Sequence, residues 1–436
     1  MGRIFGLLRN TIARMMRSNG GLGFMLPALF FLTLFCGGII FTNYAVFVEG
    51  KMSEVLTPHN IPRATIVTRV MPEGERVVAV VLEYDAEINA GNLNLNMFSV
   101  KTKLEGKFVE RSIKKVYANN NGELLPAPFT NQGRFLVLEL NPKEPSAVTA
   151  TFDPQRFLSK RLKLEYEIEQ KVSIKSVDGK EIMPFSLITS EERHLIIDEF
   201  KALIYEDKDL GVILPYRFYV PKNIDKNKKY PLVVFLHGAG ERGNDNFLHI
   251  AWYRGAVTFA EPGQQAEHPC FVLAPQCPAD SSWTELLMRG NPFKPTKTLL
   301  AVANLIRKII SEENIDSNRI YLTGLSMGGF GTFALLIEHP ELFAGAIPIC
   351  GGADINNLER IRDIPLWIFH AEDDNLVSVE FSRSVVRRLV EIGGKVKYTE
   401  FLWGEMERMG YHPHASWIPV YDNEEVIDWL FEQRKR

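Results

Sequence analysis

The sequence is poor in cysteine, with only four among 436 residues. Cys270 and Cys277 bracket an apolar segment, and the ends of a strand of that length lie on the order of 20 Å apart. A disulfide requires Cα atoms within about 7 Å, so these two cysteines are not expected to pair. We interpret Cys270, Cys277 and Cys350 as buried small hydrophobic residues. The fourth, Cys36, lies in an apolar run near the start of the chain.

Net charge is also low. Fifty Lys and Arg residues nearly balance 53 Asp and Glu residues, and the formal net charge is −3. The main body has no basic stripe of the kind that nucleic-acid-binding proteins carry, which excludes nucleic acid as a partner. With 46% hydrophobic and 24% charged residues, the composition is that of a globular protein, long enough for two domains and an appendage.

Long hydrophobic runs are missing except for residues 24–41, which are apolar apart from Thr33 and about long enough to cross a bilayer. Basic residues precede this run and acidic residues follow it: Arg3, Arg9, Arg14 and Arg17 before, Glu49 and Glu54 after. This asymmetry predicts a cytoplasmic N-terminus and an extracytoplasmic body that is membrane-anchored, periplasmic or secreted. Residues 1–50 are thus interpreted as a membrane anchor or a cleaved signal peptide. A buried core helix is the alternative.

Residues 60–195 have the pattern of an all-β domain. Short runs of β-forming residues, such as 77–82, 135–140 and 162–168, are separated by turn clusters rich in Asn, Asp and Gly. We expect an antiparallel sandwich of immunoglobulin-like kind, without an evident cluster of catalytic residues. The stretch 187–199 is interpreted as the linker to the next domain.

Residues 196–436 have a different pattern, in which apolar strand runs alternate with helical stretches. The segment 200–220 is typical of an antiparallel hairpin leading into a sheet. Expected strands are 232–236, 271–274, 320–323, 344–349, 366–369 and 396–401, and expected helices are 296–312, 327–338, 379–392 and 424–432. This alternation predicts a largely parallel sheet with helices on both faces.

The most informative motif is Gly324-Leu325-Ser326-Met327-Gly328, which follows a strand run and precedes a helix. Such a context is typical of a nucleophile elbow, a strained turn that exposes a serine hydroxyl above the sheet. The glycines are expected because a Cβ there would collide with the neighbouring strand and helix. Ser326 is therefore the candidate nucleophile, and the alternative is a serine that caps the helix.

A nucleophilic serine needs a base and an acid that orients the base. Asp373 and Asp374 follow the expected strand 366–369, at the sheet edge where active sites of α/β proteins lie. Asp374 is preferred, and a turn residue that caps the next helix is the alternative for either. His412 and His414 lie in the loop before the last helix, and chain position alone leaves both open as the base.

The oxyanion needs backbone N–H donors. One is expected from Met327, the residue after the nucleophile, and the other from the turn after strand 232–236, with Ala239 preferred and Gly240 next. An ordinary glycine turn is the alternative. His412 and His414 are also spaced as two metal ligands, but a third ligand is not evident, so no metal and no cofactor are expected.

Residues 215–435 resemble α/β-hydrolases of the esterase group related to prolyl oligopeptidase and poly(3-hydroxybutyrate) depolymerase. The resemblance rests on four segments: 235–243 (FLHGAGERG), 274–278 (APQCP), 324–329 (GLSMGG) and 414–417 (HASW). The whole layout resembles thermophilic esterases with an N-terminal immunoglobulin-like domain. In that family the acid lies in a His-Gly-x-x-Asp-x-x-Val-Pro segment, which implies Asp374, and the His-x-Ser-Trp pattern implies His414 as the base.

The chain departs from the family pattern at Ala371, at Ser378 and in a longer segment 403–412, and these differences concern the shape of the substrate pocket. The expected fold is thus an α/β-hydrolase with an N-terminal sandwich and an N-terminal transmembrane or signal helix. The expected function is an exported serine carboxylesterase acting on a small or oligomeric ester, with Ser326, His414 and Asp374 as the triad. A serine peptidase, or a cell-surface binding protein with an inactive hydrolase fold, is the alternative, and a second copy of the chain is kept open as a partner.

Overall fold

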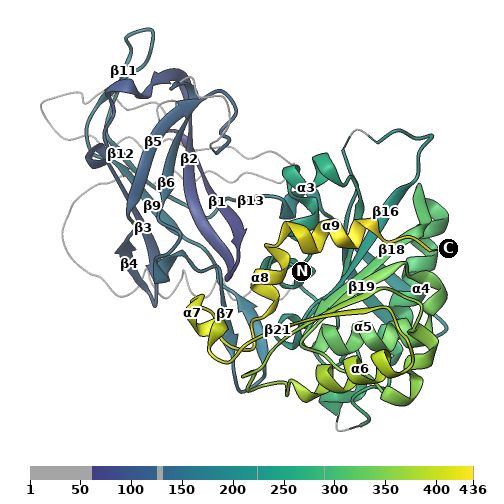
Figure 1. Ribbon diagram of the computed structural model, residues 1–436. Coiled ribbons are helices and arrows are strands. Elements are labelled where there is room, and N and C mark those ends of the chain that lie inside the picture. Colours follow the sequence, from purple (N-terminus) through teal and green to yellow (C-terminus); the bar gives the residue numbers. More distant parts are fainter. Residues whose placement is uncertain (1–60, 125–130, 223, 289, 436) are drawn as a thin grey trace, which may run out of the picture. The chain divides into compact units, whose positions relative to one another are not determined.

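The computed structural model describes residues 61–124, 131–222, 224–288 and 290–435 (Figure 1). The expected anchor or signal peptide, residues 1–50, lies outside these ranges, as does Cys36. Within the described ranges, the helices are all too short or too polar to cross a membrane.

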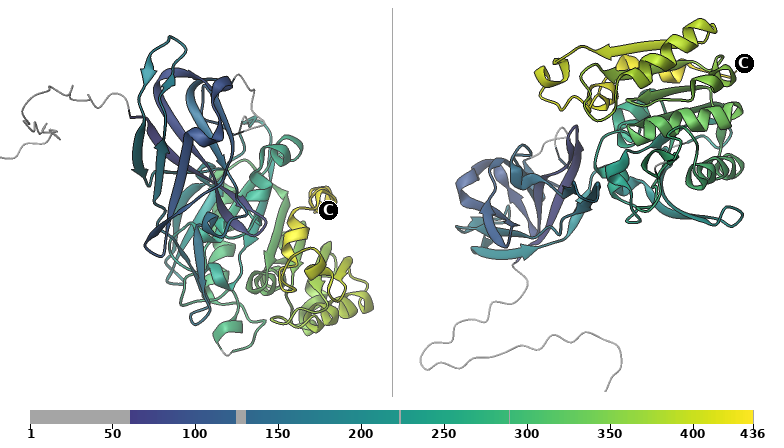
Figure 2. Two further views of the ribbon diagram at one scale, coloured as in Figure 1. Left: turned by 90° about the vertical axis from the view of Figure 1, so that its left-hand side faces the viewer. Right: turned by 90° about the horizontal axis from the view of Figure 1, so that it is seen from below.

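The N-terminal all-β domain has two main sheets, which Figure 2 shows in purple and blue. The first has the order β13-β1-β2-β6-β5 and the second the order β12-β9-β3-β4. Their strands are β1 (Arg63–Met71), β2 (Gly74–Asn89), β3 (Phe98–Leu104), β4 (Lys107–Glu110), β5 (Ile113–Asn119), β6 (Gln132–Leu140), β9 (Tyr166–Gln170), β12 (Phe185–Thr189) and β13 (Glu192–His194). Two small pairs complete the domain: β7 (Ala150–Asp153) with β8 (Leu158–Arg161), and β10 (Ile174–Lys175) with β11 (Glu181–Ile182).

The sandwich forms because its strands alternate buried and exposed residues. In β9, Tyr166, Ile168 and Gln170 are buried, while the residues between them are partly exposed. This period of two directs one face of the strand into a core shared by both sheets. The all-β prediction is confirmed, although the stretch 162–168 begins its strand only at Tyr166.

The stretch 187–199 is not a linker, and this prediction was wrong. It contains the end of β12 and the whole of β13, whose residues pair in parallel with β1 from Ile66 to Thr68. Its charged residues hid the strand, because Glu192, Arg193 and His194 lack the apolar alternation that marks a strand in the sequence.

The C-terminal domain, residues 196–436, has one eight-stranded sheet in the order β14-β15-β17-β16-β18-β19-β20-β21. The six strands from β17 to β21 in this order are parallel, and the hairpin β14–β15 is antiparallel. The strands are β14 (Lys201–Asp207), β15 (Val212–Tyr219), β16 (Tyr230–Leu236), β17 (Phe271–Pro275), β18 (Ile315–Leu325), β19 (Gly345–Ile349), β20 (Leu366–Ala371) and β21 (Val396–Phe401). The predicted hairpin and the largely parallel sheet are confirmed.

Helices cover both faces of this sheet (Figure 1), and each face has its own apolar core. One face packs against α4 (Lys297–Glu312), α5 (Met327–Glu338) and α6 (Glu380–Glu391), and the other against α2 (Leu248–Ala251), α8 (Trp417–Tyr421) and α9 (Glu424–Glu432). The central strands are buried on both sides, as in β17 and β19, where every residue is buried. This explains why they read as continuous apolar runs in the sequence.

Shorter elements join these. They are α3 (Pro262–Glu267), α7 (Glu405–Arg408) and the 3-10 helices η2 (Ala90–Asn92), η3 (Leu95–Met97), η4 (Pro145–Ala147), η5 (Ile197–Glu199), η6 (Ala239–Glu241), η7 (Val257–Ala260), η8 (Glu285–Met288), η9 (Pro340–Leu342) and η10 (Ile355–Ile361). Cys270, Cys277 and Cys350 are free and buried, which confirms their interpretation as small hydrophobic residues.

Candidate active site

Ser326 lies in a sharp turn between β18 and α5. Its φ of 54° and ψ of −118° are unfavourable for a residue with a side chain. The surrounding glycines permit the turn, because a Cβ on Gly328 would lie 1.9 Å from the carbonyl oxygen of Leu236 and one on Gly324 would lie 2.4 Å from that of Gly328. The backbone N–H of Ser326 donates to the carbonyl oxygen of Ile349 at 3.0 Å. The turn is thus held in a strained conformation that the elbow motif requires.

Ser326, His414 and Asp374 form a chain of hydrogen bonds. His414 Nε2 lies 2.9 Å from Ser326 Oγ, and His414 Nδ1 lies 2.7 Å from Asp374 Oδ2. A carboxylate only accepts hydrogen bonds, so Nδ1 carries a proton toward Asp374 and a neutral ring has a free Nε2 that can accept the proton of Ser326. The three residues come from the turn after β18, the turn after β20 and the loop before α8.

The environment of Asp374 favours its ionised form. Burial alone would raise the pKa of this carboxyl, but hydrogen bonds from His370 and His414 outweigh burial and hold the pKa well below its usual range. Asp374 Oδ1 also accepts from the backbone N–H groups of Leu376 and Val377, each at 2.9 Å. The carboxylate therefore has a fixed orientation toward His414.

His370 is a residue of this site that the sequence reasoning missed. It is fully buried at the end of β20, and its Nε2 lies 3.2 Å from Asp374 Oδ2. The same nitrogen contacts the carbonyl oxygen of Val377 at 3.0 Å, and Nδ1 contacts Ser382 Oγ at 2.8 Å. Because a carbonyl oxygen only accepts, Nε2 carries a proton, which it presents to Asp374 as well. Its position in the sequence, four residues before the candidate acid Asp374, could have indicated that it belongs to the site.

The alternative acid and base have other contacts. Asp373 Oδ2 accepts from the backbone N–H of Gly404 at 2.8 Å and so anchors the segment before α7. His412 Nδ1 accepts from the backbone N–H of His414 at 3.1 Å, which supports the loop that carries His414. Asp374 and His414, but neither Asp373 nor His412, thus lie in the hydrogen-bond chain to Ser326.

The loop after β16 contains the other predicted oxyanion residues, Ala239 and Gly240, at the start of η6. His237 holds this loop in place, because its Nε2 accepts from the backbone N–H of Cys277 at 2.9 Å and its Nδ1 donates to the carbonyl oxygen of Gly238 at 2.6 Å. Met327 begins α5, and the first N–H groups of a helix have no partner within the helix. Met327 and Ala239 both line the same cavity as Ser326.

Two cavities meet at Ser326. One of about 380 Å³ extends along the loop of His412, His414 and Ala415 and is lined mostly by apolar surface, much of it aromatic, and the other of about 320 Å³ extends along α5. Apolar side chains line most of the second cavity, among them Leu286, Leu287, Phe330, Val377 and Phe381. A substrate with two arms around a reacting carbonyl fits this arrangement.

The sandwich domain contributes to both cavities, which the sequence did not reveal. Phe157, from the hairpin β7–β8, lines both cavities, and Phe152 lines the larger one. The two rings pack edge to face with centroids 5.1 Å apart. Arg242 ties the hairpin to the oxyanion loop, because it donates to the carbonyl oxygens of Ala239 at 2.8 Å and Phe157 at 3.3 Å. The contact joins segments far apart in the sequence, and local patterns carry no signal for it.

A metal ion could occupy part of this site. Cys350, Asp374 and His414 are buried and bring ligand atoms within 4.8 Å of one another. An ion there would engage the groups that link His414 to Asp374. Burial, and then the Asp374 carboxylate, raise the pKa of the Cys350 thiol far above its usual value, which disfavours the thiolate that binds metal. These residues are therefore better suited to proton transfer than to metal binding.

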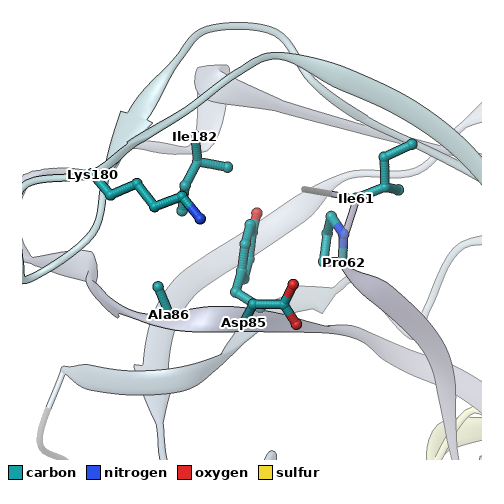
Figure 3. A pocket seen from close by; sticks show the side chains of 7 residues that line it. Ile61, Pro62, Asp85, Ala86, Lys180 and Ile182 are labelled. Atoms are coloured by element: carbon teal, nitrogen blue, oxygen red, sulfur yellow. The ribbon is translucent and has the colours of Figure 1, made fainter. Parts of the chain in front are cut away.

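A small hollow in the sandwich has no comparable chemistry. Figure 3 shows Ile61 and Pro62 on one side of it and Lys180 on the other. Its volume of about 10 Å³ holds roughly one water molecule. The hydroxyl of Tyr84, at its wall, already donates to Gln170 Oε1 at 2.8 Å. The hollow is too small for an organic substrate.

Comparisons with known proteins agree with this architecture. Residues 63–183 match the esterase Ig-like N-terminal domain, and residues 289–399 match the prolyl oligopeptidase family. The crystal structure of a thermostable esterase is 55% identical to the chain and superposes with a TM-score of 0.84, over 85% of this chain and 99% of the other. The chain belongs to the esterases with an immunoglobulin-like N-terminal domain. This confirms the resemblance and the α/β-hydrolase fold.

Curated relatives match this chain over shorter regions. Poly(3-hydroxyalkanoate) depolymerase C of Paucimonas lemoignei is 29% identical over 140 residues, which are 31% of this chain and 30% of the relative. The bifunctional acetylxylan esterase/xylanase XynS20E of Neocallimastix patriciarum is 26% identical over 163 residues, which are 37% of this chain and 22% of the relative. The chain thus spans less than a third of the length of either relative.

Proposed function

We propose that the protein is a serine carboxylesterase that acts through Ser326, His414 and Asp374 and an acyl-enzyme. The observation that carries the proposal is the hydrogen-bond chain from Ser326 Oγ through His414 to Asp374, at 2.9 and 2.7 Å. These are distances at which a proton can move between nucleophile and base. The chain lies at the meeting point of two cavities that can hold the two arms of an ester.

Acylation begins when Ser326 Oγ attacks the ester carbonyl carbon and its proton moves to His414 Nε2. Asp374 stabilises the imidazolium that forms and keeps the ring oriented, without taking the proton itself. The negative charge on the carbonyl oxygen is stabilised by the N–H groups of Met327 and Ala239, with Gly240 as a further donor. The intermediate then collapses, and His414 gives its proton to the leaving alcohol oxygen.

Deacylation repeats these steps with water as the nucleophile. His414 Nε2 takes a proton from water as the water oxygen attacks the acyl carbon. The second intermediate then collapses, His414 returns the proton to Ser326 Oγ, and the carboxylic acid is released. The same residues serve both halves of the reaction. Neither half needs a metal or an organic cofactor.

A fluorophosphonate probe tests whether the serine is activated, since only a nucleophilic Ser326 becomes labelled. We expect stoichiometric labelling of the wild-type protein and none of Ser326→Ala. The absence of labelling in a folded wild-type protein would instead favour a binding protein with an inactive hydrolase fold.

A serine peptidase is the second candidate, because residues 289–399 match the prolyl oligopeptidase family. The discriminating measurement compares kcat/KM for p-nitrophenyl butyrate with that for peptidyl p-nitroanilides. We expect the ester to react faster by at least about 10³-fold, which corresponds to about 4 kcal/mol of difference in activation free energy. A peptidyl amide that reacts as fast as the ester would reverse the assignment.

The location is proposed from the N-terminal sequence. The apolar run 24–41, with arginines before it and acids after it, supports an extracytoplasmic body, anchored or released. Protease added to intact spheroplasts should then digest residues 61–436, and full protection until lysis would contradict this orientation.

A further inference from the structure

Exposed apolar side chains surround the opening of the two cavities beside Ser326. Five large apolar residues line one or both cavities and are still between 36% and 59% exposed: Phe152, Phe157, Leu287, Leu376 and Phe381. They include every exposed phenylalanine among the residues that the structure describes. We call these five residues the apolar rim.

Four separate segments contribute to the apolar rim. Phe152 and Phe157 belong to the hairpin β7–β8, Leu287 to η8, Leu376 to the turn after β20 and Phe381 to α6. A single exposed apolar side chain is ordinary on a protein surface, whereas a group that several segments bring to one place marks a binding surface. Because each of the five residues also lines a cavity, the apolar surface continues from the cavities to the solvent.

Leu402 and Trp403 are a further exposed apolar pair beside the rim. They are 61% and 73% exposed, and Trp403 is the most exposed large apolar residue of the described ranges. They directly follow β21, whose end pairs in parallel with the end of β20, and the backbone N–H of Trp403 donates to Glu372 Oε2 at 3.1 Å. The pair therefore lies at the same edge of the sheet as the turn that carries Asp374 and Leu376.

We propose that the apolar rim and the Leu402–Trp403 pair form a docking surface for a neutral ester that is present as a separate apolar phase, as in emulsion droplets. This inference rests on the proposed esterase function. Contact with such a phase would remove the exposed side chains from water, which favours binding. An ester molecule could then pass from the phase into the cavities along a continuous apolar surface.

Two other occupants fit this surface less well. A second copy of the chain that covered the rim would close both cavities and block access to Ser326. A membrane with anionic lipids attracts clusters of Lys and Arg. The segments that carry the rim instead have charges of both signs, with Arg156 and Lys160 in the hairpin but Glu285 in η8 and Glu372 after β20. A neutral apolar phase requires neither sign.

The kinetic test follows hydrolysis of tributyrin by pH-stat titration below and above its solubility limit. For the wild-type protein we expect the rate on emulsified ester to exceed the maximum extrapolated from dissolved ester by about threefold or more, because docking raises the local ester concentration. The variants Leu287→Ser/Leu376→Ser and Leu402→Ser/Trp403→Ser should each lose at least about half of this excess, because they remove apolar surface from the contact.

The matched control is Ile204→Ser/Ile213→Ser. It removes two apolar side chains that are 71% and 63% exposed but lie in β14 and β15, outside the cavities. This variant should keep the excess rate of the wild type. Since all variants retain residues 1–60, a difference between them reports on the substituted surface.

Trp403 also allows docking to be measured without turnover, because it is the most exposed of the six tryptophans. In Ser326→Ala we expect tributyrin droplets to protect tryptophan fluorescence from quenching by acrylamide. Ser326→Ala/Trp403→Phe should lose this protection, which would assign it to Trp403.

An emulsion rate no higher than the extrapolated maximum, or an excess rate that both substituted variants keep, would overturn the docking surface. Stronger protection of Trp403 by phosphatidylglycerol vesicles than by tributyrin droplets would assign the surface to a membrane instead. A wild-type dimer in light scattering that becomes a monomer in Leu287→Ser/Leu376→Ser would assign it to a second copy. If droplets protect Trp403 but dissolved tributyrin and p-nitrophenyl butyrate are not hydrolysed, the esterase proposal fails and the apolar docking surface remains.

Discussion

The turn around Ser326 and the hairpin β7–β8 lie on the same cavities but differ in construction. The turn is surrounded by backbone at distances that only glycine permits, as at Gly328 and Gly324. The hairpin instead presents two aromatic side chains, Phe152 and Phe157, each 42% exposed. The first region tolerates almost no change in volume, whereas the second borders open space. The comparison separates the residues that carry out the reaction from those that shape access to it.

The substitution Ser326→Ala is the sharpest test of the turn around Ser326. Removing the proposed nucleophile should reduce kcat for p-nitrophenyl butyrate by roughly 10⁵-fold or more, because the remaining groups can only bind the substrate. Circular dichroism and the unfolding midpoint should stay close to the wild type. A folded variant with a tenth of the activity would end the assignment of Ser326.

The next effect distinguishes two histidines of one loop. We expect His414→Ala to lose on the order of 10⁴-fold in kcat, since it removes the proposed base. His412→Ala should lose less than about tenfold, a change of at most about 1.4 kcal/mol in activation free energy, because the His412 ring supports the loop through the backbone N–H of His414 and lies outside the hydrogen-bond chain to Ser326. Measured under the same conditions, the reverse order would transfer the role to His412.

The hairpin should show a smaller and selective effect. In Phe152→Ala/Phe157→Ala we expect kcat/KM for 1-naphthyl acetate to fall about tenfold, because the large alcohol loses apolar contact, roughly 1.5 kcal/mol or more. Methyl acetate, which does not reach the hairpin, should change by less than about threefold. The control Ile204→Ala/Ile213→Ala removes two exposed apolar side chains of β14 and β15, outside the cavities. An equal loss for both acetates would mean that the hairpin supports the triad itself.

The smallest expected effect concerns stability. The pKa of Asp374 is lowered in the folded protein, so its ionised form adds to the free energy of unfolding above the unfolded pKa of about 4. This contribution is lost as the pH falls below that value toward the folded pKa. Asp374→Asn should therefore be less stable than the wild type at pH 7 by on the order of 2 kcal/mol.

The difference should then shrink by about 1.4 kcal/mol per pH unit below about pH 4, which urea unfolding at several pH values would measure. Asp373→Asn, which affects one hydrogen bond to Gly404, is the control and should cost about 1 kcal/mol at pH 7. A constant difference between wild type and Asp374→Asn down to pH 3 would contradict a lowered pKa.

The sequence was sufficient to predict those structural features that follow from the spacing of neighbouring residues. The elbow motif, the alternation of strands and helices and the hairpin 200–220 all depend on local spacing, and the structure has each of them. The acid and the base were narrowed to two candidates each, because Asp373 and Asp374 are neighbours and His412 and His414 are two apart. The family resemblance favoured Asp374 and His414, and the tertiary hydrogen bonds join these two, rather than Asp373 and His412, to Ser326.

The remaining features depend on contacts between distant segments. β13 is short and charged, and it pairs with β1 although most of the sandwich sequence separates the two strands. The hairpin β7–β8 reaches the cavities through Phe157 and Arg242, which no spacing rule connects. The lack of a hydrogen-bond partner for Trp417 Nε1 among the described residues likewise depends on the tertiary surroundings of the ring.

The contact between Phe157 and Arg242 also has a consequence for how the protein responds to heat. One wall of the cavities belongs to the sandwich, which has an apolar core of its own, although Val70 of β1 packs in a core of the C-terminal domain. If the sandwich loosens first, this wall moves while the sheet below Ser326 keeps its packing. On warming, discrimination between bulky and small esters should then decline at a lower temperature than hydrolysis itself. The ratio of the hydrolysis rates of a bulky and a small ester would thus report on the thermal stability of the sandwich.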